Sequence, residues 1–126
     1  MNKSINTDKA PKAIGPYSQA IKCDDGTMYV SGQLPIDPKT GDIVDECVKC
    51  QSKQSILNIK AILQQEGYDL KDVVKTTVLL TDINDFAAMN EVYNQYFSQP
   101  YPARCAYQVS ALPKGAKVEM EAIAKK

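Results

Sequence analysis

Arg104 and two glutamates near the end of the chain are the residues best suited to carry chemistry. Side chains around Arg104 alternate with a period of two, which predicts a strand over residues 101–109 with a guanidinium on one face. Glu119 and Glu121 lie in a second predicted strand, residues 117–124. If these strands pair in antiparallel fashion across the turn at 112–115, Arg104 shares a face with Glu119 and Glu121. A slip of one residue would reverse this placement.

This arrangement predicts a site for a small carboxylate that bears a reactive carbon. Arginine binds a carboxylate through two charge-assisted hydrogen bonds. A nearby glutamate, with its pKa perturbed by a cleft, could exchange protons with a water molecule and a departing amine. The alternative is an ion pair between Arg104 and Glu119 or Glu121 that has no further role. The residues alone favour neither interpretation.

The chain has no histidine, which removes several common kinds of site. Ser-His-Asp and Cys-His nucleophiles and His-ligated metals are excluded. The sequence also has no glycine-rich phosphate motif, so nucleotides have no evident binding loop. We therefore expect no metal and no nucleotide cofactor.

Cys47 and Cys50 form a CxxC motif, which is typical of a redox pair or of half a zinc site. No second CxxC occurs, and Cys23 and Cys105 are isolated. A thioredoxin-like site would also follow a strand, whereas this motif follows a loop rich in proline and glycine. We therefore favour a third interpretation, in which these thiols are small packing residues.

Composition limits the class of protein further. A chain of 126 residues predicts one domain over residues 1–126. Its 15 basic and 15 acidic residues give zero net charge, which argues against a nucleic-acid partner. No apolar run approaches the ~20 residues needed to span a bilayer, so no membrane partner is expected. Residues 1–15 lack the apolar core of a signal peptide, which predicts a cytoplasmic protein with reduced cysteines.

The pattern of elements predicts an α+β fold built on one sheet. Helices are expected over residues 45–66 and from Asp82 or Asn84 to Pro100. Strands are expected at residues 17–23, 27–33, 73–80, 101–109 and 117–124.

Two helices can cover only one face of such a sheet. The strand at 73–80 has Val74, Thr76, Val78 and Leu80 on one face, and its other face is only half polar. A sheet that is apolar on both faces needs cover on both. We therefore expect copies of the protein to supply the missing layer.

The sequence resembles the reactive intermediate deaminase A (RidA) family, also called the YjgF family. The resemblance covers nearly the whole chain, with the motifs in the family's order and spacing. They are AIGPYSQA at 13–20, VSGQLP at 30–35, KTTVLLTDINDF at 75–86, PAR at 102–104 and ALPKGAKVEMEAIA at 111–124.

The resemblance implies a chorismate-mutase-like fold, with a mixed sheet of about six strands and two helices on one face. It also implies a homotrimer with ligand clefts between subunits. The implied reaction is cofactor-free hydrolysis of 2-imino or 2-amino-enoic acids to 2-keto acids and ammonia, which protects pyridoxal-phosphate enzymes from damage. Arg104 would hold the substrate carboxylate and Glu119 would activate water. The implied binding residues are Tyr17, Ser31, Gly32, Asn90, Arg104 and Ala106.

Ala106 departs from the family pattern, because many members have a cysteine there. Cys105 is one place earlier and is expected to point to the opposite face. Chemistry that depends on the family thiol is therefore not expected, whereas a role for the backbone carbonyl of Ala106 would remain. The presence of Arg104 favours the branch of the family that deaminates imino acids.

Three other functions remain open at this stage. The first is a trimeric sensor that binds keto or amino acids without turnover, although such a protein would gain nothing from Glu119 near the ligand. The second is the RNA cleavage or translation inhibition attributed to some relatives, against which the zero net charge and the lack of histidine argue. The third is binding to a partner enzyme.

Overall fold

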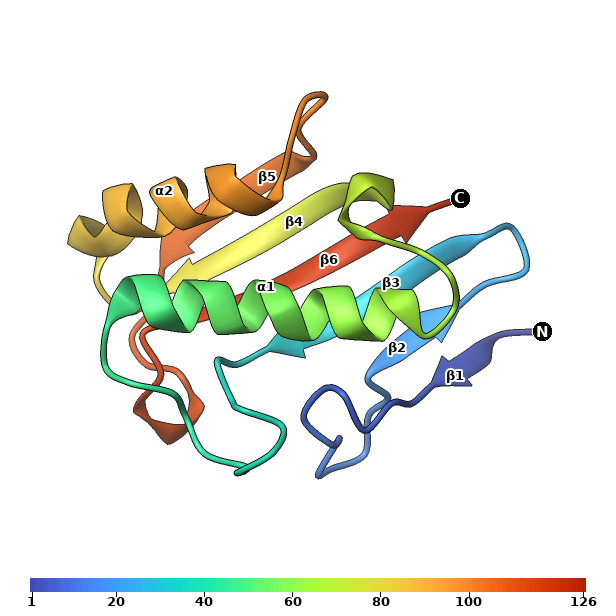
Figure 1. The fold of residues 1–126 in the computed structure, drawn as a ribbon, viewed down its shortest axis with the longest axis horizontal. Coiled ribbons are helices and arrows are strands. Elements are labelled where there is room, and N and C mark those ends of the chain that lie inside the picture. The colour runs from blue at the N-terminus through green and yellow to red at the C-terminus, as the bar shows by residue number, and fades with distance from the viewer.

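A computed structural model describes residues 1–126 as a six-stranded mixed sheet with two helices on one face (Figure 1). The predicted fold class is confirmed. The strands are β1 (Lys3–Ile5), β2 (Ala20–Lys22), β3 (Thr27–Gln33), β4 (Val73–Leu80), β5 (Ala103–Gln108) and β6 (Val118–Lys125), and the helices are α1 (Val48–Gln64) and α2 (Phe86–Tyr96). Their order across the sheet is β1-β2-β3-β6-β4-β5. Neither helix is long and apolar enough to cross a membrane.

The local turns follow the sequence signals. Gly26, with φ of 87°, closes the hairpin between β2 and β3. Gly67, with φ of 76°, follows the end of α1. Asp82 accepts a hydrogen bond from the backbone N–H of Asn84 and caps a 3₁₀ turn, after which α2 begins at Phe86. The short edge strand β1 was not predicted.

The predicted pairing of the last two strands is wrong. Strand β5 pairs with β4 in parallel, and β6 lies between β3 and β4, antiparallel to both. The reason is burial. On β6 one face is fully apolar and buried, which requires a central position, whereas β5 is exposed along most of its length. A polar strand of this kind is suited to the edge of a sheet. The buried residues of β6 are Val118, Met120, Ala122 and Ala124.

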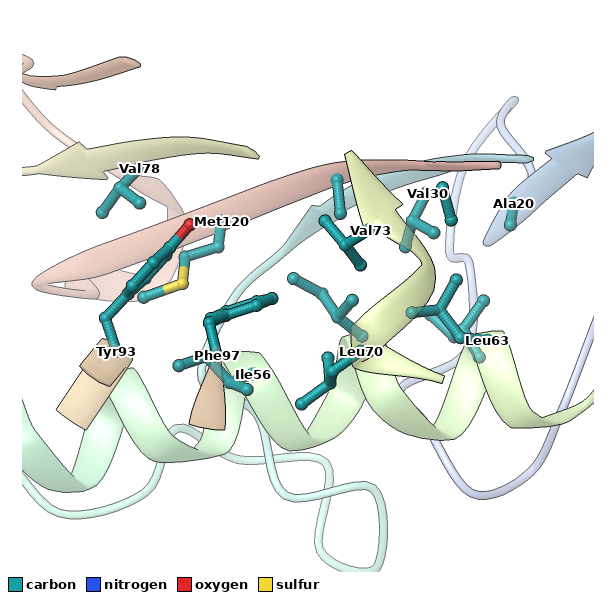
Figure 2. Close-up of a cluster of buried hydrophobic side chains, with 14 of the residues drawn as sticks. Ala20, Val30, Ile56, Leu63, Leu70, Val73, Val78, Tyr93, Phe97 and Met120 are labelled. Carbon is teal, nitrogen blue, oxygen red and sulfur yellow. The ribbon is translucent and has the colours of Figure 1, made fainter. Parts of the chain in front are cut away.

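The core fills the space between the helices and one face of the sheet (Figure 2). Ile56 and Leu63 of α1 point towards the sheet, as does Tyr93 of α2. The rings of Tyr93 and Phe97 stack with their centroids 4.4 Å apart. The Tyr93 hydroxyl and the Thr76 hydroxyl form a buried hydrogen bond of 2.7 Å, so the one polar pair at this position is satisfied.

No element covers the opposite face of the sheet, which we call the open face (Figure 1). Tyr29 on β3 and Tyr107 on β5 are each 51% exposed, so this face presents aromatic side chains to solvent. The alternation of buried and exposed side chains on β4 differs from the prediction at its first two residues. A register shift between Val73 and Lys75 buries Val73 and leaves Val74 exposed.

Candidate active site

Arg104, the only arginine of the chain, lies on the helix-covered face of β5. It pairs in register with Thr76, whose hydroxyl contacts Tyr93 in the core. The parallel pairing of β4 and β5 is made by the crossover through α2, so this helix packs over Arg104. The guanidinium is consequently held against α2 although the residue remains exposed to solvent.

Three contacts with α2 orient the guanidinium. Arg104 Nη1 donates a hydrogen bond of 2.7 Å to Asn90 Oδ1. The guanidinium carbon lies 4.7 Å from the ring centroid of Tyr93 and 5.3 Å from that of Phe86. These are cation–π distances. Arg104 forms no ion pair, so most of its donors are free for a ligand. A cleft of about 420 Å³ opens here, lined by Asn90, Tyr93, Asn94, Tyr101, Pro102 and Arg104.

Glu119 lies on the open face of β6, where it pairs in register with Leu79. Burial of this half-buried carboxyl raises its pKa above the ordinary value, and the nearby charge of Glu121 raises it further. Glu119 has no cationic partner within ion-pair distance. A carboxyl whose pKa is shifted towards neutrality is suited to accept and return a proton.

Gly32 makes the space for the Glu119 side chain. The pairing of β3 with β6 shifts register between Val30 and Gln33, so Gly32 lies in an irregular part of the strand. A β-carbon at position 32 would be 3.0 Å from both Cδ and Oε2 of Glu119. Real β-carbons do not approach so closely without a shift of the neighbour, so any larger residue would displace the carboxyl.

The segment before β2 forms the other wall of this cleft. Ser31 Oγ donates a hydrogen bond of 2.5 Å to the carbonyl of Ser18, and Ser31 N–H donates to the carbonyl of Gln19. Tyr17 is 52% exposed at the mouth. The cleft has a volume of about 650 Å³ and is lined by Pro11, Lys12, Ile14, Tyr17, Gln19, Ser31, Gly32, Gln33, Leu34, Ile36, Pro113, Lys114, Glu119 and Glu121.

The predicted site residues therefore fall into two groups on opposite faces of one sheet. Arg104 and Asn90 form one group, and Tyr17, Ser31, Gly32 and Glu119 form the other. The expectation that Arg104 shares a face with Glu119 and Glu121 is wrong, because Thr76 of β4 pairs with both Arg104 and Ala122 and so puts the two glutamates on the other face. The alternative of an ion pair between them within one chain is wrong for the same reason.

The alternation along β5 is confirmed. Ala106 pairs with Val78 and packs against the core on the face of Arg104, whereas Cys105 pairs with Thr77 on the open face. Tyr93 was not predicted from the sequence as a site residue, although its ring contacts the guanidinium. Tyr93 follows Asn90 by three residues, a spacing that puts both on one helix face and could have indicated the contact.

The packing interpretation of the CxxC motif is also wrong, because Cys47 and Cys50 are both exposed. Cys47 is the N-cap of α1. No group of three or more Cys, Asp or Glu side chains is placed to share a metal ion.

Comparisons with known proteins identify the class that shares this fold. A crystal structure of RidA from the Antarctic bacterium Psychrobacter sp. matches with a TM-score of 0.94 and 52% identity, covering 98% of this chain and 99% of that one. The structure of E. coli TdcF with bound serine matches with a TM-score of 0.92 and 45% identity, covering 98% of both chains.

Sequence comparisons agree with the structural ones. The goat (Capra hircus) protein named 2-iminobutanoate/2-iminopropanoate deaminase is 56% identical over 124 residues, which are 98% of this chain and 90% of the goat protein. The sequence model of the family described as endoribonuclease L-PSP matches residues 7–126. The chain therefore belongs to the L-PSP/RidA family, and the resemblance carried by its motifs is confirmed.

Proposed function

We propose that this protein hydrolyses 2-imino acids and their 2-amino-enoic tautomers to 2-keto acids and ammonia, in clefts between copies of the chain. The name of the goat relative supports the reaction class. The serine bound to E. coli TdcF supports a ligand that carries a carboxylate and a nitrogen on the adjacent carbon. The observation that carries the proposal is Glu119, a half-buried carboxyl with a raised pKa that is placed over Gly32 in a cleft.

The separation of Arg104 from Glu119 supports a cleft between copies. One chain cannot bring both groups to one small ligand, because they lie on opposite faces of its sheet. The open face is also uncovered and presents Tyr29 and Tyr107. We propose a homotrimer in which each open face packs against neighbouring copies. In this assembly Arg104 of one copy faces the Glu119 cleft of the next.

The chemistry in such a cleft needs two fixed groups. Arg104 binds the substrate carboxylate through a two-pronged contact, while Asn90 and the ring of Tyr93 hold the guanidinium in place. Tyr17, Ser31 and Gly32 form the wall against which the imine carbon lies, and the carbonyl of Ala106 faces the ligand from the side of Arg104. The bound carboxylate offsets the charge of Arg104, so the pKa of Glu119 stays high.

Glu119 then acts as base and acid in turn. It takes a proton from water while the oxygen forms a bond to the imine carbon, and the C=N double bond becomes a single bond to an amine. Glu119 returns that proton to the nitrogen, which gives a neutral amino alcohol. It then transfers the hydroxyl proton to the same nitrogen, the C–N bond breaks with its electron pair leaving on ammonia, and the C=O bond forms. Only water and proton transfers are needed, so we propose no cofactor. We further propose that the reaction takes place in the cytoplasm.

Hydrolysis is favoured over simple binding by the same carboxyl. A protein that only binds a carboxylate gains nothing from a second acidic group beside the ligand. No observation on this chain favours RNA cleavage, although the family description includes the word endoribonuclease.

The test generates 2-iminobutanoate in situ with a pyridoxal-phosphate dehydratase and follows its loss spectroscopically. The purified protein should accelerate the loss and release one keto acid and one ammonia per imine. An unchanged rate of loss, with a keto acid still bound by the protein, would assign it to the sensor function instead.

A further inference from the structure

Two cysteines at the start of α1 lie outside both halves of the candidate site. Cys47 is the N-cap of the helix and Cys50 lies in its first turn, and both are exposed to solvent. The sulfur of Cys47 accepts a hydrogen bond of 3.2 Å from the backbone N–H of Cys50. The N-cap acceptor is usually an oxygen of Ser, Thr, Asp or Asn, so here a reactive sulfur replaces it.

The surroundings of the two thiols are unequal. A hydrogen bond from the Cys50 thiol lowers the pKa of Cys47, and the backbone N–H groups of Cys50 and Lys49 lower it further, against the charge of Asp45. The same contact raises the pKa of Cys50. Cys47 is therefore the thiol of the two that loses its proton more readily. This is the division between an attacking and a resolving thiol.

The backbone allows the two sulfurs to join. Residues three apart at a helix surface have β-carbons about 5–6 Å apart, and a disulfide needs about 3.5–4.5 Å. Cys47 is extended at φ −64° and ψ 122°, outside the helix proper. Rotation about its Cα–C bond moves the sulfur away from the Cys50 N–H, while the Cys47 carbonyl keeps its hydrogen bond from the Gln51 N–H. Neither cysteine is buried, so closure displaces no core residue.

We propose that Cys47 and Cys50 form a reversible dithiol–disulfide pair that exchanges with low-molecular-weight disulfides. The Cys47 thiolate attacks one sulfur of the small disulfide, which forms a mixed disulfide and expels the first small thiolate. Cys50 then loses its proton to solvent and attacks the Cys47 sulfur. The Cys47–Cys50 bond forms and the second small thiolate leaves. The protein loses two thiol hydrogens, and one small disulfide is reduced to two thiols.

The remaining cysteines have no such neighbour. Cys105 lies on β5 and Cys23 on the β2–β3 turn, and neither thiol has a hydrogen-bond partner. Each would retain a mixed disulfide if it reacted. They are therefore replaced together, as Cys23→Ser with Cys105→Ser, to give a background that contains only the proposed pair.

The experiment treats this reduced background protein with glutathione disulfide and follows its mass and free thiols. The mass should fall by two hydrogens with no retained glutathione, both thiols should be lost, and dithiothreitol should restore them. Adding Cys50→Ser should leave one lasting glutathione on Cys47. Adding Cys47→Ser instead keeps an N-cap oxygen and hence the helix. In that variant Cys50 should react with glutathione disulfide about tenfold or more slowly than Cys47 does in the Cys50→Ser variant.

Other outcomes would overturn the proposal. These are no reaction of the background protein, a lasting glutathione adduct on it, disulfides between molecules, or equal rates for the two single-cysteine variants. Circular dichroism of each variant establishes that α1 is intact, so a slow rate cannot come from an unfolded helix.

Discussion

The helix-covered face of the sheet and its open face hold the two halves of the proposed site, and these halves differ in character. On the covered face, Arg104 is fixed by Asn90 and two aromatic rings, and its positive charge has no carboxylate partner. On the open face, Glu119 is half-buried without a cationic partner, and the one charge that shifts its pKa is the carboxylate of Glu121. Each half is built in full by one chain, yet neither charge is balanced there. In the proposed assembly, a small carboxylate bound between two copies would bring both charges into use.

The largest effect is expected from breaking the covered half. Arg104→Ala should reduce imine loss to the uncatalysed rate, since alanine cannot hold the substrate carboxylate. Arg104→Lys should also be poor, because an ammonium lacks the planar fork. Stopped-flow kinetics and the size of the assembly are measured together. A near-normal rate for Arg104→Lys would mean that charge alone is sufficient, and an Arg104→Ala protein that unfolds would point to a structural role.

Breaking the open half should cost almost as much rate while leaving ligand binding intact. Glu119→Gln keeps the shape of the side chain but removes the base, so the rate should fall on the order of 10²–10⁴-fold. Keto-acid binding by calorimetry should persist, because Arg104 is unchanged. Glu121→Gln is the matched control and should cost far less. Equal losses for these two variants would show that Glu119 is not the base.

The Glu119→Gln protein should also be more stable than the wild type. Because the pKa of Glu119 is raised in the folded protein, the folded state binds this proton more tightly than the unfolded chain. The group therefore favours folding below its unfolded pKa, and that contribution is lost as pH rises through the folded pKa. Glu119→Gln has no such loss, so its Tm at neutral pH should exceed that of the wild type. A lower Tm would contradict the inference that the buried carboxylate of Glu119 destabilises the folded protein at neutral pH.

A smaller effect should come from the support of Arg104. Asn90→Ala removes the hydrogen bond to the guanidinium but leaves its contact with Tyr93. KM should rise about tenfold, with kcat less affected, because a hydrogen bond to a charged group is lost. Asn94→Ala is the control: Asn94 lines the same cleft but bonds to Tyr101, not to Arg104. Equal changes in both variants would mean that Asn90 acts only through the general shape of the cleft.

The smallest effect should be a change in pH dependence on the open face. Glu121→Gln removes the charge that adds to the raised pKa of Glu119. The acid limb of the profile of kcat/KM against pH should therefore move to lower pH. Glu46→Gln, which changes an exposed carboxyl before α1, should leave the limb in place. A limb that does not respond to Glu121→Gln would mean that it reports another group.

Local signals were sufficient to predict most of the elements. The β-branched run of β4, the helix that ends before Gly67 and the Asp25-Gly26 turn each reflect short-range preferences. The prediction that β5 pairs with β6 was wrong because it rested on their closeness in the sequence. Burial decides which strands are neighbours in the sheet. The alternating apolar residues of β6 indicate a strand with neighbours on both sides, and the polar β5 indicates an edge.

The residues of the proposed site were predicted from the sequence, but the face of the sheet on which each one lies was not. The motifs predicted Arg104, Glu119, Gly32 and Asn90, because a resemblance to a family indicates which positions of the chain hold the site residues. Which face each side chain occupies depends on strand order, and a misplaced strand reverses it. The contact of Gly32 with Glu119 joins β3 to β6 and has no signal in either segment alone.

The central claim is that Arg104 and Glu119 act together across two copies of the chain. Arg104→Ala and Glu119→Gln proteins with different affinity tags are refolded together, and assemblies that carry both tags are isolated. In a trimer that contains both variants, one of the three clefts combines an intact Arg104 with an intact Glu119, so the rate should be about one third of the wild-type rate. A rate no higher than that of either variant alone would contradict the claim, because it would mean that both residues of each site come from the same chain.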